Sequence, residues 1–422
     1  MNKNKGNVFA IAICFFLFAM ISFVTGLQNP MGIIAKAQFG ATNLMSQLGN
    51  AANFIAYAFM GLPAGFLLKG KGYKFSALAA VTVGFVGVGI SYLSGVFGSY
   101  AIYLLGAFVS GFSMCMLNTV VNPMLNTLAG GGNKGNQLIQ LGGSCNSIGG
   151  TIAPILLGYL IGGQASEATV ADAAPALIIA MAIFAVAFVV IYFSAIPEPH
   201  METAEEKAAR LSGKAKKDPH GPMSFRHFVL GAAAIFFYVG VEVGIPNTAN
   251  IYMSGLEGVG PAIAGTVVGF YWFCMMLGRL FGGAVGAKVS SKAMLTFACV
   301  LALVFVGCIM FIPESVKMTV PVVDAQVPVS MVFMFLCGLC TSVMFGSIFN
   351  LATEGLGKYT PVASGIFMAL ICGGGIMPFI QGLVADAAGF INSYWVVIIG
   401  LAYMLFYAVA GSKNVNKDIP VE

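Results

Sequence analysis

The chain has 422 residues, of which 59% are hydrophobic and only 8% are charged. A soluble domain carries about 25% charged residues, so this composition excludes an ordinary soluble fold and favours a protein embedded in lipid. The 54 glycines suit the same class, because glycine lets membrane helices pack closely. All nine cysteines lie inside apolar runs, where helix packing is expected rather than a disulfide framework or a metal site.

Apolar runs long enough to cross a bilayer recur along the whole chain. A spanning helix needs about 20 apolar residues, and these runs are too long and too apolar for the strands of a barrel. The first run follows Met1-Asn-Lys-Asn-Lys5 without a small-residue cleavage site, so we expect an uncleaved span rather than a signal peptide. We predict twelve spans, at residues 8–28, 44–68, 75–95, 100–128, 137–162, 174–196, 225–253, 261–283, 292–312, 328–353, 362–388 and 392–412.

The longest polar stretch, 197–224, separates six predicted spans from the other six. It predicts an N-terminal six-helix bundle over 1–196, a cytoplasmic linker with a short surface helix at 201–211, and a C-terminal six-helix bundle with a short tail over 225–422. The predicted fold is therefore an all-α membrane protein made of two pseudo-symmetric halves.

Charge predicts the orientation of these spans. If both termini are cytoplasmic, 18 of the 20 lysines and arginines fall on the inner side, and only Lys36 and Lys317 fall outside. This distribution obeys the positive-inside rule. We therefore expect a multi-pass protein of the inner (cytoplasmic) membrane with both termini in the cytoplasm.

The two predicted halves resemble each other in sequence. A shift of 224 positions carries Asn126 onto Asn350, and a shift of 216 carries Pro30 onto Pro246. Parallel repeats of six spans are typical of the major facilitator superfamily, whose substrate site lies at the midplane between the halves. The 224-residue shift also superimposes a cluster within the fifth and eleventh spans, in which Gly149, Gly150, Ile152, Pro154 and Gly158 fall on Gly373, Gly374, Ile376, Pro378 and Gly382.

Two glycine-rich segments resemble degenerate copies of the cytoplasmic loop motif of that superfamily. One contains Gly61 and Gly65 and continues to Lys69, and the other contains Arg279. Small residues let helices approach each other, and cations anchor helix ends at the inner surface. These four residues support the fold and carry no information about the substrate.

Polar side chains recur at helical spacing inside the predicted spans. An unpaired amide in apolar surroundings costs about 2–7 kcal/mol, so each needs a partner or water. Hydrogen bonds between helices explain any single one. The set together favours a wet central cavity for a neutral polyhydroxylated ligand, because we place no lysine or arginine deep in a span. The substrate-binding candidates are Asn50, Asn53, Tyr57, Asn118, Asn122, Gln140, Asn146, Asn247, Tyr271, Trp272, Asn350 and Gln381; the aromatic ones could stack on a sugar or simply pack.

Glu242 is the acidic residue that we place near the middle of a span. A charged group at that depth is costly and is a functional candidate by default. It could carry a coupling proton or help to bind sodium, or it could be a buried, hydrogen-bonded carboxyl without a transport role.

Several stretches resemble the fucose–galactose–glucose symporters of the major facilitator superfamily. They include Phe15-Phe-Leu-Phe-Ala19, Pro63-Ala-Gly-Phe-Leu-Leu-Lys69, Asn146-Ser147 and Tyr238-Val-Gly240, and the clearest runs from Ile348 to Gly389. The resemblance covers nearly the whole chain. It implies twelve helices and import of a neutral sugar, such as glucose, galactose or fucose, by alternating access.

The chain departs from this family at the positions that matter for coupling. Proton-coupled fucose permeases have an aspartate and a glutamate where this chain has Gly26 and Asn118, and the family's fifth-span polar pattern reads Leu138, Gln140 and Gly143 here. Either Glu242 carries the proton instead, or the carrier couples to sodium or to no ion. Two of the family's proton sites are absent, which favours sodium.

Other functions fit the sequence less well. A carrier of the same fold for a polyol, a sialic-acid-like sugar or an exported compound remains an alternative. An enzyme would need a nucleophile with a base or a metal cluster, whereas His200, His220 and His227 all fall in or near the predicted linker. We expect a monomer in membrane lipid, with no cofactor, metal or nucleic acid, and with co-transported H⁺ or Na⁺ as an open alternative.

Overall fold

Long helices make up nearly all of the chain in the computed structural model, which describes residues 3–41, 43–161, 168–198, 219–254, 256, 260–320 and 325–421. The first part of the chain forms α1 (Lys3–Gly26), α2 (Gln28–Phe39), α3 (Asn43–Phe97), α4 (Tyr100–Leu128), α5 (Gly132–Ile161) and α6 (Val170–Phe193). The second part forms η2 (Pro222–Ser224), α8 (Arg226–Ser254), α9 (Gly260–Val285), α10 (Ser291–Phe311), α11 (Ser330–Ser342), α12 (Met344–Thr353), η3 (Gly357–Tyr359), α13 (Thr360–Ala369), η4 (Leu370–Cys372), α14 (Gly373–Ala388), α15 (Tyr394–Phe406) and the π-turn η5 (Tyr407–Gly411).

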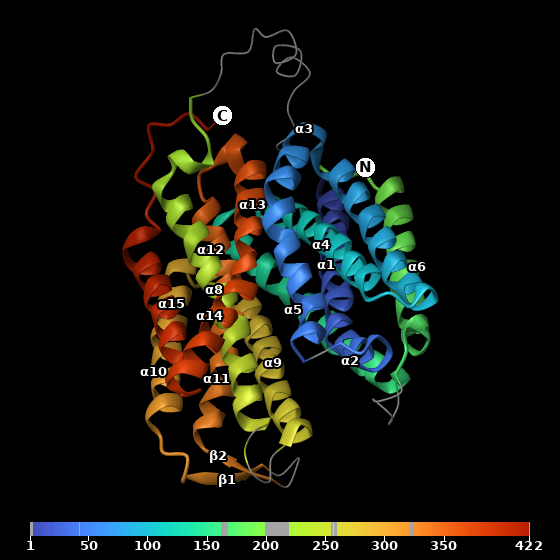
Figure 1. The fold of residues 1–422 in the computed structure, drawn as a ribbon. Helices are drawn as coiled ribbons and strands as arrows, with labels where there is room; N and C mark the ends of the chain where they lie inside the picture. Colours follow the sequence, from blue (N-terminus) through green and yellow to red (C-terminus); the bar gives the residue numbers. More distant parts are fainter. Residues whose placement is uncertain are drawn as a thin grey trace.

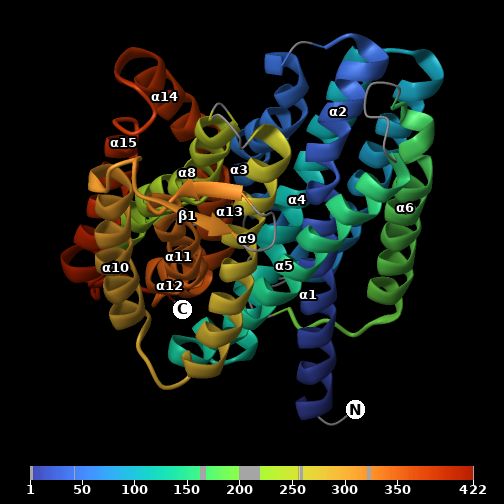
Figure 2. The ribbon, with the colours of Figure 1, turned by 90° about the horizontal axis from the view of Figure 1, so that it is seen from below.

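The helices stand side by side in two groups. Figure 2 shows α1–α6 on one side of the molecule and α8–α15 on the other. Both chain termini lie at one end of the helices, which we name the terminal end (Figure 1). The opposite end carries an antiparallel hairpin of β1 (Lys317–Val320) and β2 (Ala325–Pro328), and we name it the hairpin end.

The predicted spans agree with these helices to within a few residues. Ten candidate spans occur in the described residues, and one of them, Leu48–Phe97, is 50 residues long. That span is interrupted at Gly72, whose φ of 80° is the left-handed conformation that glycine adopts without strain. The break separates the two spans predicted at 44–68 and 75–95. The multi-span, all-helical class is therefore confirmed.

Two elements were not predicted, and one prediction lies outside the described residues. The helix α2 and the β1–β2 hairpin are short and partly polar, so they gave no span-length apolar run. The surface helix expected at 201–211 falls in the part of the linker that the structure does not describe.

The start of the linker caps the helix that follows Gly72. The Glu198 carboxylate accepts hydrogen bonds from the backbone N–H groups of Tyr73 (2.5 Å) and Lys74 (2.9 Å), and the Lys74 ammonium donates to the Ser194 carbonyl at 2.9 Å. Burial raises the pKa of the Glu198 carboxyl above its usual value, while the two N–H donors oppose that rise. The carboxylate satisfies two N–H groups that the first turn of a helix leaves without partners.

Candidate functional site

The crossing of α3 with α13 is one of the two most extensive helix contacts between the groups. A Cβ added to Gly65 would lie 2.9 Å from the Pro361 carbonyl oxygen and 3.1 Å from the Gly365 Cα, so the backbones touch. Gly61 lies one turn earlier in the same crossing. Two of the predicted loop-motif residues therefore lie inside a helix at a contact between the groups, whereas Lys69 is exposed one turn further along α3.

The second contact joins α5 to α9, and it ends partway along both helices. At the terminal end, Gln137 Nε2 donates to the Gly283 carbonyl at 3.0 Å, and a Cβ added to Gly286 would lie 3.4 Å from the Gln137 Cβ. Further along the same face of α5, Ile148 and Ile155 are exposed. The two helices therefore touch near the terminal end and diverge toward the hairpin end.

The face of α9 that carries Arg279 is also exposed toward the hairpin end. Residues seven apart on a helix lie on one face, which places Trp272 and Gly265 in line with Gly286 and Arg279. Trp272 is 43% exposed, and a Cβ added to Gly265 would meet nothing within 4 Å. On the hairpin side of Arg279 these faces of α5 and α9 are therefore not packed against each other, and we name the region between them the open space.

A charged pair lies at the floor of this space. Arg279 Nη2 donates to Glu242 Oε1 at 3.1 Å, and each side chain is 14% exposed. The other terminal nitrogen of the guanidinium, Nη1, reaches across to α5, where it donates to Ser147 Oγ at 2.8 Å and to the Gly143 carbonyl at 3.2 Å. Arg279 thus connects α8 and α9 of one group with α5 of the other.

This arrangement corrects two predictions. Arg279 does not lie in a cytoplasmic loop, because α9 continues for six residues beyond it, to Val285. The expectation that no lysine or arginine lies deep in a span is also wrong. Glu242 stands near the middle of α8 as predicted, and an arginine balances its charge. The signal was present, since Arg279 is the basic residue of the predicted apolar span 261–283.

The two neighbouring aromatic candidates have different surroundings. Tyr271 is fully buried, its hydroxyl donates to the Glu242 carbonyl at 3.0 Å, and it lies 3.0 Å from Thr341 Oγ1. It holds α9 against α8 and α11 and is not available to a ligand in the open space. Trp272 borders that space, two turns nearer the hairpin end than Arg279.

The opposite group holds a polar chain between α3 and α4. Asn118 Nδ2 donates to Tyr57 Oη at 3.1 Å, and Asn122 Nδ2 donates to the Asn118 carbonyl at 2.9 Å. Asn122 Oδ1 and Asn53 Nδ2 are buried and have no partner among the described residues. Orphaned buried groups are costly, and they suit a site that binds water or a polar ligand in part of its cycle.

Three more asparagine candidates lie on different helices. Asn146 is half-buried, accepts from Ser22 Oγ at 3.1 Å and donates to the Phe18 carbonyl at 3.0 Å, which ties α5 to α1. Asn50 is half-buried on α3, three residues before Asn53. Asn247 is exposed on α8, five residues beyond Glu242 toward the hairpin end.

Gln140 belongs to the contact between the groups rather than to the open space. It is 2% exposed, and its Nε2 donates to the Val343 carbonyl at 2.9 Å. It lies on the terminal side of Arg279 and Gly143, in the same layer as the Gln137 bond to Gly283. These amides hold α5 against the second group.

Asn350 lies near the terminal end, away from Asn247. Its Nδ2 donates to Ser291 Oγ at 2.9 Å, and its repeat-related partner Asn126 donates to Thr353 Oγ1 at 3.3 Å. Both asparagines line a cavity of about 430 Å³ between α4, α12 and the start of α13. The set of predicted candidates is therefore divided between a space that opens toward the hairpin end and a cavity at the terminal end.

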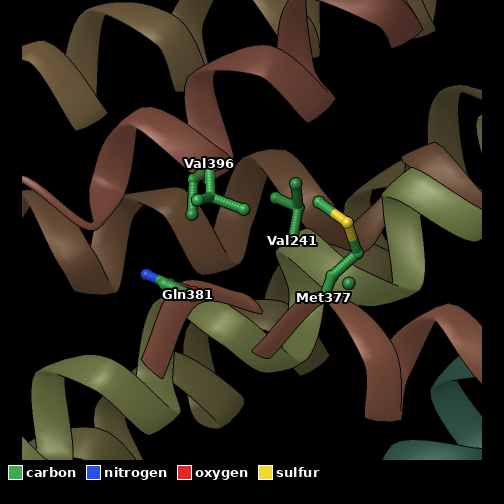
Figure 3. A pocket seen from close by; sticks show the side chains of 6 residues that line it. Val241, Met377, Gln381 and Val396 are labelled. Atoms are coloured by element: carbon green, nitrogen blue, oxygen red, sulfur yellow. The ribbon is translucent and has the colours of Figure 1, made fainter. Parts of the chain in front are cut away.

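Gln381 lies inside the second group. It is 1% exposed and lines a pocket with Val241, Met377 and Val396, shown in Figure 3, that leaves no room for a water molecule. The pocket lies between α8, α14 and α15, so Gln381 does not face the boundary between the groups. Gln381 was predicted as a substrate-binding candidate, and the structure places it in the interior of its own group.

Among the described residues, no group of three or more histidine, cysteine, aspartate or glutamate side chains could hold a metal ion. The site instead offers amides, hydroxyls, an indole ring and one balanced pair of charges. Such groups donate and accept hydrogen bonds without a net charge, which suits binding of a polar solute rather than covalent chemistry.

The comparisons agree with this architecture. The model of the Major Facilitator Superfamily matches residues 11–378. A glucose/galactose transporter of Brucella abortus (strain 9-941) is 32% identical over 98% of this chain and 96% of its own, and an L-fucose-proton symporter of Escherichia coli (strain K12) is 23% identical over 92% and 90%. A crystal structure of the fucose transporter in the outward conformation superimposes with a TM-score of 0.76 at 21% identity, covering 96% of this chain and 100% of that one. The resemblance drawn from the sequence is thereby confirmed, and the chain is a multi-pass membrane protein that belongs to the major facilitator superfamily.

Proposed function

We propose that this protein is a secondary active transporter that imports a neutral sugar, such as glucose, galactose, fucose or a similar hexose. The observation that carries the proposal is the full-length similarity to a glucose/galactose transporter. The uncharged hydrogen-bonding groups around the open space support it, because sugar hydroxyls both donate and accept.

The proposed topology has twelve spans with both termini in the cytoplasm of the cell, in its inner membrane. This number results when α3 counts as two spans and each of the pairs α11–α12, α13–α14 and α15–η5 counts as one. The helices α1, α4, α5, α6, α8, α9 and α10 are one span each. The common end of the two termini supports it. The elements that carry Lys36 and Lys317, the two cations that the predicted orientation leaves outside, lie at the opposite end (Figure 1). The terminal end would then be the cytoplasmic side.

Alternating access follows from the halves 1–196 and 225–422, joined by the linker 197–224. The α3–α13 and α5–α9 contacts close the terminal end, and the exposed faces of α5 and α9 support an opening at the hairpin end. This is the arrangement of an outward-facing carrier. Rocking of the two halves would open the terminal end and expose the bound sugar to the cytoplasm.

The proposed sugar contacts are Asn118, Tyr57 and Asn122 of one half with Trp272 of the other. Asn50, Asn53, Asn146 and Asn247 surround this set and are proposed as secondary contacts. Asn126 and Asn350 would meet the sugar on its way out at the terminal end, because they line the cavity there.

Counterflow in proteoliposomes tests the substrate. Vesicles loaded with unlabelled glucose, galactose or fucose should accumulate the same labelled sugar transiently, and empty vesicles without protein should not. An absence of counterflow with every neutral hexose would contradict the proposal.

A second experiment tests coupling through Glu242, which we propose as the coupling residue. Uptake by a proton-coupled carrier should collapse with the pH gradient, whereas uptake by a sodium-coupled carrier should require external Na⁺ at fixed pH. Uptake that responds to neither would make the protein an uncoupled facilitator.

Arg279 favours one alternative substrate. A guanidinium binds carboxylates in a bidentate manner, so an acidic, sialic-acid-like sugar is the second candidate. The neighbouring Glu242 carboxylate already balances the charge of Arg279, which favours the neutral sugar. Competition of labelled hexose by sialic acid separates the two.

A further inference from the structure

The contact between α5 and α9 ends at Arg279. On the terminal side of this residue, the Gln137 bond to the Gly283 carbonyl joins α5 to α9, and the Gln140 bond to the Val343 carbonyl joins α5 to the start of α12. On the hairpin side, Ile148 is exposed. Of the bonds across the α5–α9 contact, those from Arg279 to Gly143 and Ser147 therefore lie nearest the hairpin end.

The geometry divides the guanidinium between the two groups of helices. Nη2 is held within its own group by Glu242, and Nη1 is directed across the boundary to Ser147 and Gly143. The Tyr271 hydroxyl bonds the Glu242 carbonyl, which keeps α8 and α9 in register. Glu242 thus orients Arg279, and Arg279 makes the bond across the boundary.

We propose that Arg279 is a positioning residue of the transport cycle, which latches the terminal end closed until a sugar hydroxyl replaces Ser147 and Gly143 as the acceptor of its Nη1 donors. The proposal deepens the proposed function and rests on it for the identity of the ligand. Exchange of one oxygen acceptor for another keeps the charged group solvated while the two halves separate. Hydrogen bonds to a charged group are stronger than those between neutral groups, so the latch is a substantial part of the closure.

A disulfide across the closed contact measures the latch. A Cβ added to Gly286 would lie 3.4 Å from the Gln137 Cβ, just below the usual disulfide range, and 2.7 Å from the Gly282 carbonyl oxygen. With a small backbone shift at Gly286, Gln137→Cys with Gly286→Cys should form a disulfide when the terminal end is closed. The native cysteines, all free, are replaced in this background. This background lacks the Gln137 bond to the Gly283 carbonyl in every variant, so the cross-linking rate without sugar compares the closed populations of the variants with one another.

Arg279→Gln should lower the cross-linking rate by about tenfold, because it removes the charge-assisted bonds across the boundary. Ser147→Ala should lower it less, since the Gly143 carbonyl remains. Thr151→Ala is the matched control, because Thr151 is exposed one turn further along α5 and bonds within its own helix. It should cross-link like the parent.

Added hexose should lower cross-linking in the parent and should have a smaller effect in Arg279→Gln. Arg279→Lys keeps the charge and guards against a folding defect in the glutamine variant; it should show an intermediate rate, because one ammonium cannot reproduce the forked guanidinium. Parental cross-linking in Arg279→Gln, or equal effects of Ser147→Ala and Thr151→Ala, would overturn the latch. The cross-linking rates of the variants are measured without sugar, so they test the latch independently of the substrate. A failure of counterflow would instead count against the proposed function.

Discussion

Replacing Gly61 by alanine tests the closure of the terminal end where the two groups of helices come closest. A Cβ at this position would lie 2.5 Å from the Gly365 carbonyl oxygen and 2.6 Å from both the backbone nitrogen and the Cβ of Ala369. Two of these three atoms belong to the backbone of α13, so no side-chain rotation relieves the contact. The α3–α13 crossing must widen.

The expected magnitude follows from overpacking. Adding a methyl group to a close-packed contact costs about 1–3 kcal/mol. The cost falls on the state closed at the terminal end, so the ratio of closed to open carrier should fall by about 5- to 150-fold. Alanine also favours a helix over glycine by about 0.5–1 kcal/mol, but both states contain the helix and the ratio is unaffected.

Gly70→Ala supplies the matched control. Gly70 lies in the same helix, and a Cβ there would meet nothing within 4 Å. The assay is the disulfide between the cysteines of the Gln137→Cys, Gly286→Cys variant, which joins α5 to α9 rather than α3 to α13. A wedge at one contact should therefore lower cross-linking at the other if the halves move as rigid bodies. Equal cross-linking in Gly61→Ala and Gly70→Ala would refute the rigid closure.

The remaining predictions concern the site and the linker. Glu242→Gln should abolish uphill uptake yet spare exchange of labelled for unlabelled sugar, and accumulation that survives would remove Glu242 from coupling. Trp272→Ala should raise the KM of uptake by about two- to tenfold through loss of an aromatic contact, whereas an unchanged KM would place Trp272 outside the sugar path. Asn122→Ala should weaken uptake at normal membrane abundance; uptake like the parent's would leave it a packing residue. Glu198→Ala should lower the melting temperature in detergent, since loss of a helix cap costs about 0.5–2 kcal/mol, and Glu198→Gln should lose less.

The spans were predictable because a bilayer imposes one length on every crossing helix. The predicted span 100–128 coincides with α4, and 225–253 differs from α8 by one residue at each end. The failures are short elements that do not cross, namely α2 and the β1–β2 hairpin. Their sequences lack the apolar length that made the other elements visible.

The site was predictable in residue type but not in arrangement. Helical spacing showed that Asn118 and Asn122 share a face, and the structure joins them through the Asn118 carbonyl. The same spacing could not show that Gln381 faces α8 and α15 within its own group, or that Asn350 lies at the terminal end. Those outcomes depend on how each helix is rotated and tilted against its neighbours. The spacing of polar residues along a single helix does not encode that arrangement.

The Glu242–Arg279 pair is poorly suited to a purely stabilising role. Removing two charges from water is expensive, and well-packed apolar residues often hold helices together at least as well as a buried ion pair. The two side chains are each only 14% exposed, so most of that desolvation is incurred. An apolar pair could hold α8 against α9 but could not donate to a hydroxyl and a carbonyl of α5, as Arg279 does. These two acceptors are oxygens of the kind that a sugar carries, so the bonds can be exchanged for sugar contacts without a change in their chemistry. The structure thus favours a pair retained for a reversible bond across the boundary, and closure of a carrier has to be reversible for the carrier to cycle.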